Sequence, residues 1–230
     1  MPVPNPPSPG PSPGSRTGLW VVKIGGNPAD WEMLPNWLDL LARAARPVVI
    51  VPGGGQFAGA VRDEQELWRF HDAIAHRMAI LAMDQYGLML HGICPSLHLA
   101  DEEIRLRAHI RAGLPTICLL TGLVLHRPEV VENWDVASDS MAAWLAAQLH
   151  AETLVLVKSV SCHSGTIDAV ELARDGVVDA AFPLWRSRFT GETWCVHRDR
   201  PDLMEAALAT GIGPGCRLPR SQALQKEILS

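Results

Sequence analysis

Short runs of purely apolar residues recur along the chain, and most of them end at glycine, proline or lysine. Runs of Val, Ile and Leu without polar alternation are typical of strands that are buried on both faces, as in parallel sheets. The pattern therefore predicts buried strands at 19–24, 48–51, 88–93, 116–120 and 154–157, with a further short strand at 194–196.

Between these runs, apolar side chains recur every three to four residues, a spacing that predicts helices with one buried face. The expected helices cover residues 30–44, 64–85, 101–112, 138–150 and 201–209. In the longest, the expected buried stripe is Leu67, Phe70, Ile74, Met78 and Leu81. Alternating strands and helices predict an α/β fold, a three-layer αβα sandwich with a largely parallel central sheet.

The first 17 residues have a different composition from the rest of the chain. They hold seven of the eighteen prolines and almost no large apolar side chains. Such a segment buries too little apolar surface to fold, so we expect a disordered, proline-rich tail at 1–17. Within one continuous sheet, a boundary near residue 150 separates two sets of motifs that we expect to serve different ligands.

Composition and charge exclude several classes of function. A net charge of −5 argues against a nucleic-acid-binding protein, which would need a basic face. No run of about 18 apolar residues suggests a membrane span. The five scattered cysteines form no CxxC pair, and the N-terminus shows no signal-peptide pattern, so we expect reduced thiols in a cytoplasmic protein.

Two glycine clusters directly follow the first two predicted strands. Ligands of doubly wound sheets bind outside the carboxyl ends of the strands, and glycine backbones there form anion-binding nests. Lys23 stands just before the first cluster in an apolar strand, where a lysine is costly unless it is paired. A bound phosphate and a structural ion pair are both suitable partners. The glycines are Gly25, Gly26, Gly53, Gly54 and Gly55.

A second polar group lies at the predicted start of the 138–150 helix and at the end of the fifth strand. Ser138 or Asp139 is a suitable N-cap, which is the structural interpretation. Lys158 closes an apolar strand, as Lys23 nearly does. Two strand-end lysines around one aspartate suit phosphoryl transfer, in which a protein mainly positions the reactants and neutralises charge. The chain has no GxxxxGK[ST], GxGxxG or GxSxG motif.

The order Lys-x-Gly-Gly, Gly-Gly-Gly, Asp-bearing helix start and strand-end Lys resembles the amino acid kinase superfamily, over residues 19–218. Residues 51–62, 75–87 and 134–140 resemble its aspartokinase-like branch with the phosphate kinases of methanofuran biosynthesis. The resemblance implies an ATP-dependent phosphotransferase acting on a small phosphate- or carboxylate-bearing molecule, most specifically an aminomethylfuran-methyl phosphate. It also implies a homo-oligomer, an acceptor-binding lobe at 18–150 and a nucleotide-binding lobe at 151–230.

The resemblance also implies residue roles. Lys23 would contact the transferring phosphate, Lys158 would stabilise the leaving β-phosphate, and Asp139 would organise both lysines. The five glycines would offer backbone amides to phosphates, with Mg²⁺ held mainly by the oxygens of the nucleotide rather than by a protein metal site. The residues expected to face the acceptor are Arg62, His76 and Asp135.

One departure from the family pattern supports a different function. After Lys158 the chain reads Ser-Val-Ser-Cys-His-Ser-Gly, where many members carry an aspartate that opens a nucleotide loop. The alternative is a catalytically inactive protein that binds a ligand or oxyanion on the same fold. A third possibility is a partner subunit that docks through the proline-rich tail.

Overall fold

Six parallel strands form the centre of the computed structural model, which describes residues 18–25, 31–125, 127–160 and 165–220. In these ranges the sheet has eight strands in the order β3-β4-β2-β1-β5-β7-β8-β6, and β8 is antiparallel to β7. The predicted tail at 1–17 lies outside the described residues. The strands are β1 Trp20–Ile24, β2 Val48–Pro52, β3 His98–Ala100, β4 Thr116–Cys118, β5 Thr153–Lys158, β6 Gly165–Thr166, β7 Glu192–His197 and β8 Cys216–Arg217.

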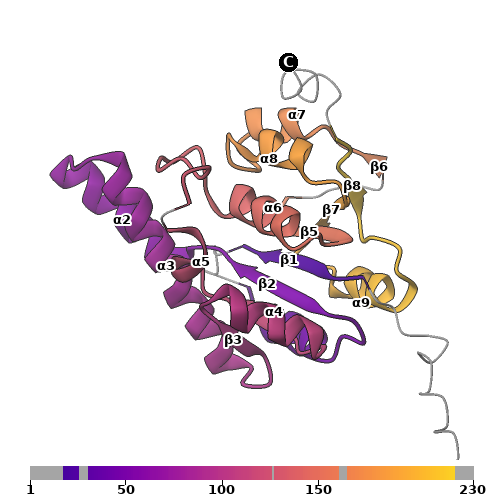
Figure 1. The fold of residues 1–230 in the computed structure, drawn as a ribbon. Helices are drawn as coiled ribbons and strands as arrows, with labels where there is room; N and C mark the ends of the chain where they lie inside the picture. Colours follow the sequence, from indigo (N-terminus) through magenta and orange to yellow (C-terminus); the bar gives the residue numbers. More distant parts are fainter. Residues whose placement is uncertain (1–17, 26–30, 126, 161–164, 221–230) are drawn as a thin grey trace, which may run out of the picture.

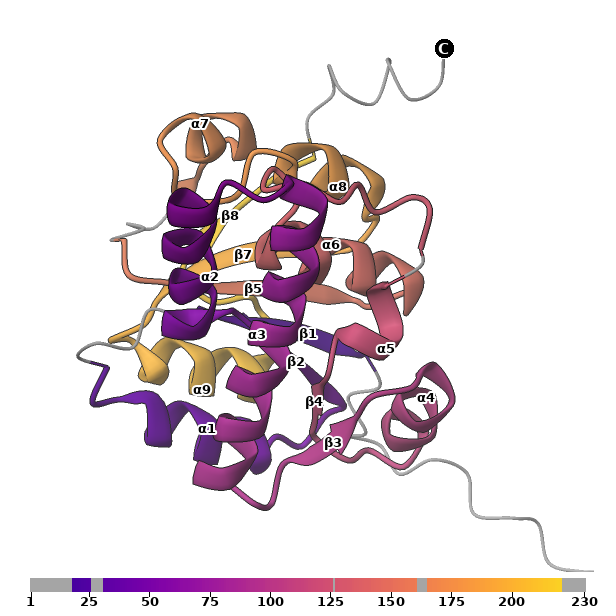
Figure 2. The ribbon, with the colours of Figure 1, turned by 90° about the vertical axis from the view of Figure 1, so that its left-hand side faces the viewer.

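Helices cover both faces of this sheet, which confirms the predicted three-layer αβα architecture (Figure 1). In Figure 2, α2 and α3 lie side by side as a helical hairpin that faces the viewer. The helices are α1 Leu34–Ala42, α2 Gly55–Trp68, α3 Asp72–Ile93, α4 Glu103–Arg111, α5 Thr121–Val124, α6 Ser138–Gln148, α7 Ala169–Arg174, α8 Phe182–Arg188 and α9 Pro201–Thr210. Within the described ranges, no helix combines the length and apolar character needed to cross a lipid bilayer.

The side-chain alternation of the strands divides the core into two clusters. On β1, Val21 packs with α6 and α8, whereas Trp20 and Val22 pack with α1, α9 and the second half of α3. Because successive side chains of a strand point to opposite faces, Lys23 shares the α6 face with Val21. The same rule places Lys158 on the face of Leu154 and Leu156, which also belong to the α6 cluster.

Two sequence predictions about the α2–α3 region are wrong. The expected helix at 64–85 is broken, because Arg69 adopts a left-handed conformation (φ 55°) that ends α2. The expected strand at 88–93 is the last part of α3, since a short apolar run fits a strand and a buried helix equally well. The third strand of the chain is β3 instead.

The face of α3 that packs on the protein also differs from the expected stripe. Ile74 and Leu81 are 50% and 48% exposed, whereas small residues such as Ala75 and Ala79 are buried. The buried face of α3 also holds Ile80, Met83, Tyr86 and Leu90, so the helix carries large apolar side chains on its exposed face as well as on its buried one. The protein therefore carries an apolar ridge on α3 that this chain alone does not cover.

Candidate active site

Two lysines from neighbouring strands meet on one carboxylate. The Lys23 Nζ lies 3.0 Å from Asp139 Oδ1, and the Lys158 Nζ lies 2.6 Å from Asp139 Oδ2. The Lys158 ammonium also donates to the Val177 carbonyl at 2.7 Å. All three side chains are nearly buried, with 6–11% of each exposed. The structure thus brings together the three residues that the sequence analysis assigned to phosphoryl transfer.

Strand register explains this convergence. β1 and β5 are parallel neighbours in which Ile24 pairs with Val157, so Lys158 lies just beyond the end of that pairing. Both lysines project toward the face covered by α6, and Asp139 is in the first turn of α6. The carboxylate therefore reaches both ammonium groups from above the carboxyl ends of the two strands, the usual ligand position in such sheets.

The electrostatics of the cluster favour the charged form of Asp139. Burial by itself would raise the pKa of Asp139, but the Lys158 and Lys23 ammonium groups outweigh it and hold this pKa at about 2. Burial lowers the pKa of Lys23, and the Asp139 carboxylate opposes that shift. Asp139 alone does not balance two ammonium groups, which suits an incoming phosphate, and the nearby Asp179 carboxylate offsets part of the remaining positive charge.

The start of α6 is capped by a residue that the sequence analysis missed. Neither Ser138 nor Asp139 is the N-cap, because the cap position is Ala137, which makes no side-chain capping bond. The Asp179 Oδ2 accepts hydrogen bonds from the amides of Ala137, Asp139 and Ser140 at 3.0–3.2 Å, and its Oδ1 accepts from the Ser140 hydroxyl. A carboxylate about 40 positions away thus fixes the turn that carries Asp139. No local motif marks it.

Asp179 gives a prediction for stability against pH. Burial and the neighbouring Asp139 charge raise the pKa of Asp179 from 3.8 to about 6. The folded state then holds a proton between pH 4 and 6 that the unfolded state has released, so the stability due to this group falls as pH rises through that window. Asp179→Asn stays neutral throughout. We expect urea unfolding to show wild type losing free energy of unfolding relative to Asp179→Asn from pH 4 to 6; an unchanged difference would contradict the assignment.

A small cavity of about 180 Å³ opens beside the two lysines. It is lined by Lys23, Gly25, Trp31, Val157, Lys158, Ser159, Val177 and Arg198. A Cβ at Gly25 would lie 3.4 Å from the Val157 carbonyl oxygen and 3.9 Å from the Lys23 Nζ, so a side chain there would fill the space next to the ammonium group. The Tyr86 hydroxyl donates to the Gly25 carbonyl at 3.4 Å and helps to hold this turn in place.

The second glycine cluster leads into α2, but its three glycines are not equivalent. The Gly53 amide donates to the Ile24 carbonyl at 2.8 Å and continues the sheet, so it is engaged rather than offered to a phosphate. Gly54 caps α2, and a Cβ there would lie 2.3 Å from that of Ala58. Gly55 has φ 57°, which glycine adopts readily. The first amides of any helix lack partners within the helix, so those of α2 remain available to an anion. Gly26 lies outside the described residues.

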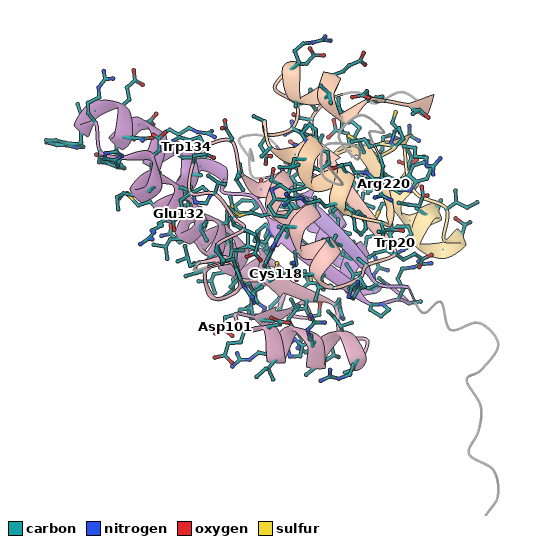
Figure 3. All side chains as sticks on the ribbon, turned by 45° about the horizontal axis from the view of Figure 1, so that its top comes forward. Trp20, Asp101, Cys118, Glu132, Trp134 and Arg220 are labelled. Atoms are coloured by element: carbon teal, nitrogen blue, oxygen red, sulfur yellow. The ribbon has the colours of Figure 1, made fainter. Side chains whose placement is uncertain are left out.

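A larger cavity of about 440 Å³ lies between the start of α2, α3 and the segment that leads into α6. Trp134 lies on that segment near α2 (Figure 3). Its Nε1 donates a hydrogen bond to Gln65 Oε1 at 2.6 Å, and the Arg62 Cζ lies 4.5 Å from the centre of its ring. The residues that line this cavity are Gly54, Gly55, Gln56, Ala58, Gly59, Arg62, His76, Ala79, Met83, Trp134, Val136, Ala137, Ser138 and Met141. The volume of the cavity suits a small molecule.

Of the three residues expected to face an acceptor, two line this cavity. Arg62 and His76 do, whereas Asp135 is exposed, binds Asn133 Nδ2 at 3.1 Å, and is not among the lining residues. Ser138 lines the large cavity, and the next residue, Asp139, binds the lysines that line the small one. The lysine–aspartate cluster is therefore situated between two cavities. In the described part of the chain, no three His, Cys, Asp or Glu side chains are grouped as a metal site.

Comparison with known proteins identifies the family of the chain. The sequence profile of the amino acid kinase family matches residues 18–162. A curated relative is [5-(aminomethyl)furan-3-yl]methyl phosphate kinase of Methanocaldococcus jannaschii, 24% identical over 195 residues, which cover 80% of this chain and 90% of the relative.

Solved structures show the same fold. Uridylate kinase from Archaeoglobus fulgidus superposes with a TM-score of 0.66 at 15% identity, over 87% of this chain and 99% of that one. UMP kinase from Bacillus anthracis gives a TM-score of 0.66 at 17% identity, over 89% and 96% of the two chains. Profile, relative and fold agree with the order of motifs in the sequence. The chain belongs to the amino acid kinase family and is a kinase.

Proposed function

We propose that this kinase transfers the γ-phosphoryl group of ATP to the phosphate of a small acceptor, and that the acceptor is [5-(aminomethyl)furan-3-yl]methyl phosphate or a close analogue used to build a methanofuran-type one-carbon carrier. The reaction breaks the bond between the γ-phosphorus and the β,γ-bridging oxygen. It forms a new bond from an acceptor phosphate oxygen to that phosphorus, giving a diphosphate and ADP. The named relative supports this choice of acceptor.

The position of the lysine–aspartate cluster between the two cavities carries the proposal. A phosphoryl group passing from one cavity to the other must cross the region of Lys23 and Lys158, where charge on its non-bridging oxygens is neutralised. Asp139 holds both ammonium groups in place, so little rearrangement is needed during transfer. The acceptor's phosphate would lie near Arg62 and the first amides of α2.

The described residues of the small cavity suit a polyphosphate, and no carboxylate that could bind a metal ion is among them. Its ionised lining side chains are the cations Lys23, Lys158 and Arg198. Both oxygens of Asp139 already contact ammonium groups, and Asp179 accepts backbone amides, so neither carboxylate is disposed as a magnesium ligand. Mg²⁺ would accordingly be held by the oxygens of ATP, where it neutralises phosphate charge.

The proposal is tested by ³¹P NMR of the purified protein with ATP, Mg²⁺ and the furan phosphate. We expect new diphosphate resonances with wild type and at least about a 100-fold slower reaction with Lys23→Ala. Calorimetry with ATP and Mg²⁺ separates the alternatives. Tight ATP binding without turnover would redirect the search to another acceptor, whereas no ATP binding would favour a non-catalytic ligand-binding protein.

The apolar ridge on α3 supports a homo-oligomer. Ile74, Leu81 and Leu88 are spaced seven residues apart, and each is 48–51% exposed. A seven-residue repeat along one helix suits packing against the same helix of a second copy. We propose that two copies associate through this ridge.

Leu81→Asp tests this association. A carboxylate in the middle of an apolar helix–helix contact lacks a partner, so we expect the variant to sediment as a monomer while wild type sediments as a dimer or larger species. Ile104→Asp is the matched control, since Ile104 is 80% exposed on α4, away from the ridge. Equal sedimentation of wild type and Leu81→Asp would contradict the proposed contact.

A further inference from the structure

His76 combines deep burial with an unused hydrogen-bonding atom. It lies on α3 with 2% of its surface exposed. Its Nε2 lies 2.9 Å from the Val136 carbonyl oxygen. Its Nδ1 has no hydrogen-bond partner among the described residues, although it is fully buried. Buried polar atoms without partners are rare, and each one calls for a specific explanation.

The hydrogen bond to Val136 fixes the character of the free nitrogen. A carbonyl oxygen only accepts, so Nε2 must be the donor and carry the proton. Burial lowers the pKa of His76, which favours the neutral ring, and a neutral ring protonated at Nε2 has an acceptor lone pair at Nδ1. The unused atom therefore needs a hydrogen-bond donor.

The surroundings indicate where that donor comes from. His76 lines the 440 Å³ cavity together with Arg62, and it also borders a second cavity of about 420 Å³ that is lined by Arg77 and Glu132. Of the two, the 440 Å³ cavity is the one that adjoins the start of α2, and its described lining residues include Arg62 and no carboxylate. An anionic group of a ligand consequently fits near Arg62 and the start of α2. A hydrogen-bond donor elsewhere on that ligand would then meet the uncharged Nδ1 of His76.

We propose that His76 Nδ1 accepts a hydrogen bond from an amino or hydroxyl group of the acceptor, so that the cavity selects phosphate monoesters that carry such a donor. This inference rests on the proposed function and adds to it a residue that determines specificity. Arg62 and the first amides of α2 bind the phosphate, and His76 binds the amino or hydroxyl substituent at the other end of the ligand. A site with a buried polar atom discriminates strongly against an analogue that leaves this atom unpaired.

Two matched variants separate this role from a structural one. In His76→Asn the amide oxygen takes the place of Nδ1, which keeps the acceptor and loses the bond to Val136. In His76→Gln the amide nitrogen takes the place of Nε2, which keeps the bond to Val136 and loses the acceptor. Calorimetry without ATP measures binding of [5-(aminomethyl)furan-3-yl]methyl phosphate and of its 5-methyl analogue to each protein.

We expect wild type and His76→Asn to bind the aminomethyl ester at least about tenfold more tightly than the methyl ester, and His76→Gln to bind both equally. Equal binding of both esters by wild type would overturn this inference alone, and that comparison needs no variant. A preference kept by His76→Gln and lost by His76→Asn would show that His76 acts through Val136. Binding of neither ester would overturn both the inference and the proposed acceptor.

Discussion

Lys158→Met is expected to lower kcat by about 100- to 1000-fold while leaving the KM for the acceptor within a factor of about three. The methionine keeps the length and apolar stem of the lysine but removes the ammonium that contacts Asp139 Oδ2 at 2.6 Å. Removing one preorganised charge donor from a transfer site typically costs this much, and the loss appears in kcat because the interaction strengthens in the transition state. Initial rates of ADP formation at varied acceptor concentration measure both constants.

Arg43→Met is the matched control for that change. Arg43 is also a cation 2.6 Å from a carboxylate, that of Asp39, but its side chain is 71% exposed at the end of α1 and lines neither cavity. We expect its kcat to equal that of wild type. A loss of less than about tenfold in Lys158→Met would remove Lys158 from the transfer step.

Asp139→Asn is expected to lower the free energy of unfolding by about 3–5 kcal/mol, because it leaves two buried ammonium groups without a carboxylate. Asp139 touches both lysines with a side chain only 6% exposed, so water cannot compensate. Chemical denaturation at pH 7 measures the change, and a loss below about 1 kcal/mol would mean that the cluster is well solvated in the free protein.

The triple variant Lys23→Met, Asp139→Leu, Lys158→Met separates stability from activity. Replacing a whole buried ion cluster by apolar side chains of similar volume is often neutral or stabilising. We therefore expect the triple variant to recover the stability that Asp139→Asn loses, yet to remain inactive. Such a result would show that the cluster serves chemistry rather than folding.

The lysine–aspartate cluster was predictable because its geometry follows from short-range rules. Apolar runs predicted β1 and β5 as buried strands, and the two-residue alternation of side chains puts Lys23 and Lys158 on one face. Asp139 was recognisable as a polar residue in the first turn of the helix that covers this face. The convergence of these three side chains can therefore be predicted from their positions in the strands and at the helix start, without knowledge of long-range contacts.

The features that sequence reasoning missed depend on distant contacts. Asp179 caps α6 from about 40 residues away, and nothing in its own segment distinguishes it from a surface aspartate. The prediction of a buried stripe on α3 is wrong because Ile74 and Leu81 have the spacing of a core face, whereas the face that is buried carries residues such as Ala79, Ile80 and Met83. Apolar spacing predicts that a helix has an apolar face. It does not say whether the same chain covers that face.

Single-turnover transfer from [γ-³²P]ATP to the furan phosphate, compared between wild type and the triple apolar variant, tests the role of the lysine–aspartate cluster most directly. We expect wild type to label the acceptor, and the triple variant to bind the acceptor with the same affinity but to transfer label at least about 1000-fold more slowly. Transfer at equal rates by the two proteins, or no labelling by wild type while ATP and acceptor are both bound, would contradict the claim that Lys23, Asp139 and Lys158 form the phosphoryl-transfer centre.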